Sequence, residues 1–139
     1  MINYREIAHR WLYQALFDLN NAKKLFPEGN FSYTCFFSEQ SAQKALKGYL
    51  IFNRNIDINI HAISKLLMRA SQLDGSFKNF IDEGKGLDKH YLSTRYPDAL
   101  PDPLVPFEAY TKEEAQTAIA SAQKIFDLCQ KLTGYAKDK

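Results

Sequence analysis

The residues best suited to chemistry lie in one proline-rich segment, residues 90–106. Within it, Arg95 stands close to Tyr91 and directly before Tyr96. A guanidinium group is planar, binds phosphate through two parallel hydrogen bonds and stacks on aromatic rings. The segment therefore predicts an arginine that contacts phosphate or RNA, beside tyrosines that clamp a base. The alternative is that Arg95 only holds the segment in place, by pairing with Asp98 or with backbone carbonyl groups.

His90 begins the same segment and is the other candidate for a catalytic role. Ser93 and Thr94 follow it, but a hydroxyl nucleophile needs an oriented base, and no elbow motif surrounds them. We expect His90 at the surface, bordering the arginine. His9 and His61 fall in other predicted elements, and we interpret His61 as a histidine hydrogen-bonded near a helix end. The sequence thus predicts no metal site.

Motif searches and composition exclude several classes of protein. The chain contains no GxGxxG, GxxxxGK, CxxC or HExxH motif, so we expect no cofactor. Its 139 residues predict a single domain, residues 1–139. The net charge of +2 is too small for a surface that coats nucleic acid. Cys35 and Cys129 share no metal-ligand spacing and are predicted to be reduced core thiols.

The sequence shows no pattern that points to a membrane. The first residues lack a basic-then-apolar signal pattern, and no apolar run approaches the length of a membrane span. We therefore expect a cytoplasmic protein without membrane contact.

The elements that must position these residues are predicted to be helices, because apolar residues recur three and four positions apart. Thr111 with Glu114 has the form of a capping box, and Gly134 suits a helix stop. Gly84 and Gly86 suggest a kink. The first four predicted helices cover residues 3–26, 31–52, 60–72 and 77–91. The last predicted helix lies between Thr111 and Gly134.

Four of the five prolines lie in residues 97–106, where they interrupt any helix. Aromatic and aliphatic residues nearby favour an ordered crossover over a disordered linker. The fold class is therefore all-α: an antiparallel up-and-down bundle of about five helices, with an ordered proline-rich crossover before the last helix.

The second predicted helix is apolar on most sides, so its polar residues are informative. Several of them lie one turn apart on the helix surface. Together with the arginine segment they form the predicted ligand-binding set, which is Arg95, Tyr91, Tyr96, Asp98, Glu39, Gln43, Lys44 and Lys47.

Five segments, taken in order, match one family. They are Trp11 with Ala15, Asp18 and Ala22; residues 31–33 leading to residues 40–47; His61 with Leu66 and Leu67; residues 87–98; and Tyr110 with Thr111 before the last helix. Residues 40–47 resemble the helix Gln-x-Ala-Glu-Lys-x-Leu-Lys, and residues 91–98 resemble Tyr-x-x-x-Arg-Tyr-Pro-Asp. The chain thus resembles the HEPN domain, the higher eukaryotes and prokaryotes nucleotide-binding domain.

The resemblance implies a small helical bundle that forms homodimers and pairs with a minimal nucleotidyltransferase in a toxin–antitoxin-like system. Many HEPN proteins are metal-independent RNases that carry an Arg, four to six residues, and then a His. Here no His follows Arg95, and His90 precedes it. Gln43 stands where the family usually has Glu on the second helix, although Glu39 lies one turn earlier.

Three hypotheses follow. The first is a module that binds a nucleotide or RNA and acts with a nucleotidyltransferase partner. The second is a metal-independent RNase, for which Arg95 and His90 are the catalytic candidates. The third is a non-catalytic domain for dimerisation or partner docking, suggested by the apolar second helix.

Overall fold

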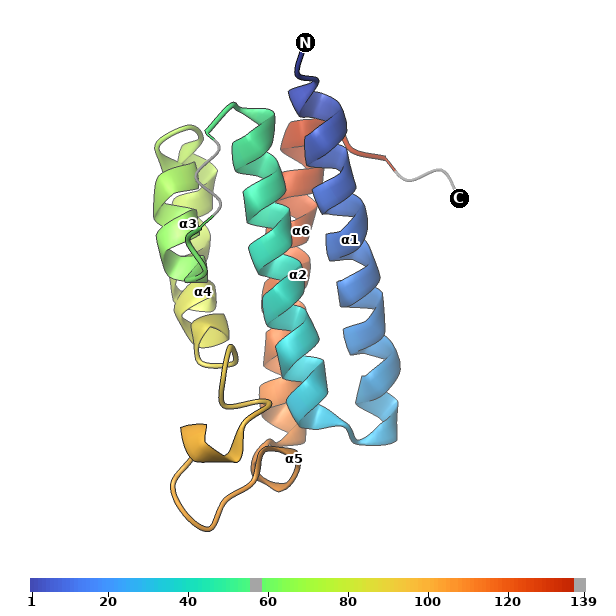
Figure 1. The fold of residues 1–139 in the computed structure, drawn as a ribbon, viewed down its shortest axis with the longest axis vertical. Helices are drawn as coiled ribbons and strands as arrows, with labels where there is room; N and C mark the ends of the chain where they lie inside the picture. The colour runs from blue at the N-terminus through green and yellow to red at the C-terminus, as the bar shows by residue number, and fades with distance from the viewer. Residues whose placement is uncertain (56–58, 137–139) are drawn as a thin grey trace.

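The computed structural model describes residues 1–55 and 59–136, and all of its regular elements are helical. The predicted all-α bundle with an ordered crossover is confirmed (Figure 1). Its α-helices are α1 (Tyr4–Leu25), α2 (Phe31–Phe52), α3 (Ile63–Ser71), α4 (Ile81–Asp88), the short α5 (Pro106–Ala109) and α6 (Lys112–Thr133). Three 3-10 turns are η1 (Phe26–Glu28), η2 (Gly75–Phe80) and η3 (Pro97–Ala99).

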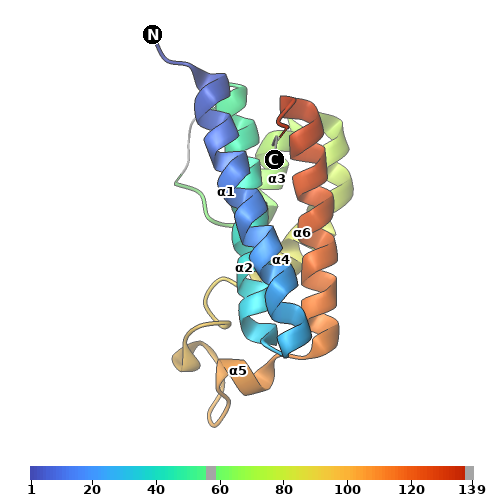
Figure 2. The same cartoon turned by 90° about the vertical axis from the view of Figure 1, so that its right-hand side faces the viewer.

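Helix α2 forms the centre of the molecule. It lies between α1 on one side and α3 with α4 on the other, and α6 packs behind it (Figures 1 and 2). Most of its residues are buried, including polar ones. The core around it is built from aliphatic side chains of every long helix and from Phe77 and Phe126. Any polar group on α2 therefore has a position fixed by neighbours on several sides.

Helices α1 and α2 approach each other closely at Gly48. A Cβ atom there would lie 2.3 Å from Leu12 Cδ2 and 3.1 Å from Trp11 Cβ. Only a residue without a side chain allows this contact. Gly48 therefore fixes how near Trp11 comes to the surface of α2.

The predicted ends of the long helices are confirmed. The Asn3 side chain accepts a hydrogen bond from the Glu6 amide at 3.0 Å and caps α1. Thr111 and Glu114 form the expected reciprocal capping box at the start of α6. Gly134 ends α6 with a positive φ of 67°, a conformation that favours glycine.

The start predicted for the third helix, residue 60, is wrong. Helix α3 begins at Ile63, because the Asp88 carboxylate accepts hydrogen bonds from the backbone amides of Ile63 and Ser64, at 2.5 and 3.2 Å. Its capping residue thus comes from the end of α4, 25 positions later. A carboxylate at a helix N-terminus satisfies free N–H groups and the helix dipole.

The fourth helix predicted over residues 77–91 is also corrected. Its first part is the 3-10 turn η2, and α4 covers only Ile81–Asp88. The expected kink does not fall at Gly84 or Gly86, because α4 runs through both. Gly84 instead allows α4 to lie against α3: a Cβ atom there would be 2.4 Å from Leu67 Cδ1.

The relative directions of α2, α3 and α4 follow from contacts that sequence patterns do not show. His61, just before α3, lies level with Gln43 and Lys47 of α2, whereas Phe77, after α3, packs on Tyr49. Helices α2 and α3 therefore run the same way, and α3 and α4 are antiparallel (Figure 1). Among the residues that the structure describes, no helix has the length and apolar character needed to cross a membrane.

Gly48→Ala tests the close approach of α1 and α2. The added methyl group would overlap Leu12 and force the two helices apart, which typically costs about 1–3 kcal/mol of unfolding free energy. We expect the thermal midpoint of unfolding to fall by several degrees. Gly86→Ala is the control, because a Cβ atom there meets nothing within 4 Å. Equal midpoints for both variants would contradict this packing.

Candidate functional site

Arg95 is half-buried and held on several sides. Its guanidinium carbon lies 4.4 Å from the ring centre of Phe36, 5.0 Å from that of Tyr96 and 5.4 Å from that of Tyr91. Nε and Nη2 both donate to the Tyr91 carbonyl oxygen, at 3.2 and 2.6 Å. Arg95 thus does bond to a backbone carbonyl, whereas Asp98 is exposed in η3.

One edge of the Arg95 guanidinium remains available. The group has five N–H donors, and the two bonds to Tyr91 use one of them on Nε and one on Nη2. Across the described parts of the chain, no carboxylate lies within 4.0 Å of Arg95. The cation is therefore fixed by aromatic rings and a carbonyl group, without an anionic partner.

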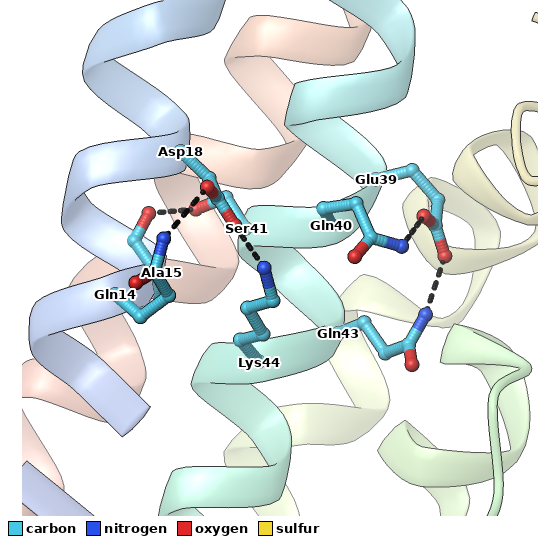
Figure 3. A network of polar contacts seen from close by, with 8 residues as sticks. All are labelled: Gln14, Ala15, Asp18, Glu39, Gln40, Ser41, Gln43 and Lys44. Carbon is cyan, nitrogen blue, oxygen red and sulfur yellow. Dashed lines mark hydrogen bonds and ion pairs between the residues drawn. The ribbon is translucent and has the colours of Figure 1, made fainter. Parts of the chain in front are cut away.

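Glu39 lies fully buried on α2. Its two oxygens accept hydrogen bonds from the side-chain amides of Gln40 and Gln43, both at 2.8 Å (Figure 3). Burial raises the pKa of Glu39 to about 7, with a further rise from Asp88; the two amide bonds and the charge of Arg95 oppose this rise. The carboxylate is thus linked electrostatically to Arg95, although they form no ion pair.

His61 joins this group through Gln43. Its Nδ1 lies 3.1 Å from Gln43 Oε1. Since the NH₂ group of Gln43 donates to Glu39, its oxygen faces His61 and accepts a hydrogen bond from Nδ1–H. Nε2 then carries the lone pair of the neutral ring. Lys47 Nζ also lies 3.4 Å from Nδ1, but it cannot donate to a nitrogen that already carries a hydrogen.

Tyr91 connects His61 with Arg95. The ring of His61 stacks on that of Tyr91, with 5.7 Å between centres and an angle of 13° between planes. Arg95 lies against the same tyrosine. We call Glu39, Gln43, His61, Tyr91 and Arg95 the Arg95 cluster. It combines a cation, an imidazole with a free lone pair and a buried carboxyl group, and the guanidinium is the member that suits recognition of a phosphate group.

The sequence does not reveal that His61 joins this cluster. The expected histidine, hydrogen-bonded near a helix end, is confirmed, because His61 lies just before α3, and its partner is a side chain 18 residues away. The available signal was the pair of polar residues one turn apart on a mostly buried helix, Glu39 and Gln43. Buried polar groups need hydrogen-bonding partners, and a neighbouring helix start is a place to seek one.

The two predicted lysines lie outside the Arg95 cluster. Lys44 forms a 2.6 Å ion pair with Asp18 of α1, which also accepts a bond from Gln14 (Figure 3). Lys47 is only 5% exposed and lies between His61 and the ring of Trp11, whose centre is 6.0 Å from Nζ. Burial lowers the pKa of Lys47, with Lys44 adding to the effect and Glu39 opposing it.

His90 and Arg95 are not brought together as a pair. Contrary to the expected surface position, His90 is 8% exposed and its ring meets Tyr110 edge-on. Burial lowers the pKa of His90, as does Lys89, while Glu114 opposes the change. The hydroxyl groups of Ser93 and Thr94 donate to backbone carbonyl groups one helical turn earlier, so neither is poised as a nucleophile.

The thiols of Cys35 and Cys129 are free and buried, as predicted. Burial raises the pKa of both groups, that of Cys35 to about 12, so they remain protonated at neutral pH. Within residues 1–55 and 59–136, no three side chains of His, Cys, Asp or Glu are grouped as metal ligands.

Comparison with known proteins gives one family. The model of the HEPN domain matches residues 8–132. A protein of Methanocaldococcus jannaschii named "Putative toxin MJ1304" is 29% identical over an alignment of 119 residues, and the match covers 80% of this chain and 78% of the relative.

Solved structures agree in fold. TT1696 from Thermus thermophilus is 33% identical, with a TM-score of 0.79 over 89% of this chain and 96% of that one. ST0689, an archaeal HEPN homologue, is 32% identical, with a TM-score of 0.74 over 91% and 97%. A HEPN domain protein of Thermotoga maritima, at 24% identity, has a TM-score of 0.69 over 91% and 99% and supports the fold alone.

Glu39→Gln tests the buried carboxylate. Folded Glu39 keeps its proton up to about pH 7, whereas an unperturbed glutamate releases it near 4.5. The folded state therefore binds more protons in this window, and stability falls as pH rises through it. We expect the variant to gain up to about 3 kcal/mol relative to wild type between pH 5 and pH 8.

Denaturant unfolding of wild type and Glu39→Gln at pH 5, 6.5 and 8 measures this difference. Other titrating groups cancel in the comparison. Stability curves that stay parallel over the whole range would mean that Glu39 is ionised in the folded protein at pH 5.

Proposed function

Because this chain belongs to the HEPN family, we propose that it is a helical module of a toxin-like system that binds RNA or a nucleotide through the Arg95 cluster. The relative with toxin in its name supports the toxin-like setting. The observation that carries the proposal is the half-buried guanidinium of Arg95, fixed by rings and a carbonyl group and free on one edge.

The physical reason is preorganisation. An arginine held by three rings loses little conformational freedom when it binds an anion, so more of the interaction energy contributes to affinity. Its planar N–H groups match two phosphate oxygens. Tyr96 is 48% exposed beside it and offers a face on which a base can stack. The homodimer and the nucleotidyltransferase partner implied by the family stay predictions.

A second candidate function is metal-independent RNA cleavage, and the position of His61 favours it. The chain lacks a histidine after Arg95, but His61, just before α3, stacks on Tyr91 with its Nε2 unused by Gln43. In this mechanism Nε2 takes the proton of a 2′-hydroxyl group. The 2′-oxygen bonds to phosphorus, the bond to the 5′-oxygen breaks, and that oxygen takes a proton from water. Arg95 neutralises the charge on the phosphate oxygens.

Arg95→Ala tests binding. Loss of a fixed charge-assisted contact should weaken RNA binding by about tenfold or more. Arg95→Lys keeps the charge but not the planar stack. Its affinity for RNA should therefore lie between that of wild type and that of Arg95→Ala. Arg5→Ala is the control, because Arg5 is an exposed arginine near the start of α1. The measurement is fluorescence anisotropy of a labelled octauridylate, with circular dichroism to verify the fold.

If Arg95→Ala and Arg5→Ala bind the labelled RNA equally well while both remain folded, Arg95 does not belong to the binding site.

His61→Ala tests cleavage. Incubation of wild-type protein with a mixed-sequence RNA in EDTA should yield fragments ending in a 2′,3′-cyclic phosphate, because the 2′-oxygen is the nucleophile. The variant should lower the rate by about 100-fold or more, as expected for loss of a general base. His9→Ala is the matched control, since His9 contacts the Thr133 carbonyl oxygen near the other end of the bundle.

RNA that stays intact with wild-type protein, under conditions where anisotropy shows binding, would leave binding as the function and remove the cleavage reaction.

A further inference from the structure

Lys47 is a buried cation without an anionic partner. It is 5% exposed, and in the described residues no carboxylate lies within 4.0 Å of Nζ. Its neighbour Lys44, which is more exposed, does have such a partner in Asp18. Buried charges in proteins are normally paired, because desolvation is costly. An ammonium group placed this way points to an anion that comes from outside the chain.

The aromatic neighbour of Lys47 opens onto a groove. Trp11 lines a hollow of about 750 Å³ along α1, a volume within the usual range of ligand sites. We call it the α1 groove. The residues that line it include Arg10, Trp11, Tyr13, Gln14, Phe17 and Lys44. Tyr13 and Phe17 are 52% and 58% exposed. Aromatic faces interleaved with cations are the usual surface for unpaired bases and their phosphates.

Lys47 connects this groove with the Arg95 cluster. Its Nζ lies 6.0 Å from the Trp11 ring centre and 3.4 Å from His61 Nδ1. The two regions lie on either side of α2: Asp18 meets Lys44 on the α1 side, whereas Glu39 and Gln43 project towards α3 and α4 (Figure 3). A ligand that crosses α2 at Lys47 can therefore contact both the α1 groove and the Arg95 cluster.

We propose that the ligand is single-stranded RNA that runs from the Arg95 cluster across α2 into the α1 groove, with a phosphate at Lys47 and a base stacked on Trp11. This inference rests on the proposed function and adds a second subsite at Lys47 and Trp11. An unpaired strand is required because the bases of a duplex are stacked on each other and cannot lie on Trp11. A mononucleotide is too short to occupy both regions.

The burial of Lys47 supports the same conclusion. Burial disfavours the charged form of this group and so lowers its pKa. A phosphate beside Nζ would compensate for that cost. The charge would then contribute to binding rather than to stability.

Trp11 makes the proposal directly measurable, since it is the only tryptophan in the chain. Its emission reports occupation of the α1 groove without a label. Octauridylate should quench or shift the emission with the same midpoint as binding measured by anisotropy. Uridine monophosphate added alone should leave the emission unchanged. The concentrations to use are those that displace octauridylate from the Arg95 cluster in a separate anisotropy experiment. Emission that stays constant while octauridylate binds would overturn the proposal.

Lys47→Met separates binding from folding. Removing an unpaired buried charge should leave the thermal midpoint unchanged or raise it, while RNA affinity should fall about tenfold at low salt. The slope of log affinity against log salt should drop by about 0.7, the value for one phosphate contact on a single strand. Lys131→Met, at the exposed end of α6, is the matched control. It should change neither the RNA affinity nor the salt slope.

Trp11→Ala should weaken octauridylate binding by about 5- to 150-fold, and Trp11→Phe by much less. If Arg95→Ala abolishes binding while Lys47→Met and Trp11→Ala bind like wild type, the Arg95 cluster is confirmed and the α1 groove is not part of the RNA path. If none of these variants changes affinity, the proposed function itself fails.

Discussion

The hydrogen bond from Gln43 to the buried carboxylate of Glu39 is the constraint on which the site depends. It uses the NH₂ group of Gln43 and so turns the amide oxygen towards His61. That oxygen fixes the proton on Nδ1 of His61 and leaves Nε2 for a ligand. Arg95 opposes the rise in the pKa of Glu39, and Glu39 opposes the fall in the pKa of Lys47. One bond between two residues of α2 thus sets which ring nitrogen of a histidine on another element carries the hydrogen.

The bundle holds polar groups where a protein selected only for stability would place apolar ones. Glu39 is fully buried with a raised pKa, and Lys47 is nearly buried with a lowered one. Both shifts record desolvation that folding must overcome. Functional sites commonly retain such unfavourable groups at the expense of stability. Gly48 adds to the arrangement, because the close contact that it allows brings Trp11 beside Lys47.

The sequence predicted those parts of the fold that local rules control. Apolar periodicity located α1 and α2, and capping chemistry located both ends of α6. The predictions failed where a residue far away in the sequence sets the start of a helix. The start of α3 is set by Asp88, and the 3-10 turn η2 replaces the start of the fourth predicted helix. For the candidate site, the sequence places Arg95 beside Tyr91 and Tyr96, which the structure brings into contact. It does not reveal that His61 joins them or that Lys44 is held by Asp18. Such contacts join residues 18 to 26 positions apart, so spacing along the chain does not reveal them.

The most direct measurement is a crystal structure of the protein with octauridylate. We expect a phosphate within hydrogen-bonding distance of the free edge of Arg95, a second phosphate beside Lys47 Nζ and a base stacked on Trp11. RNA bound elsewhere on the bundle, with both cations still unpaired, would contradict this expectation.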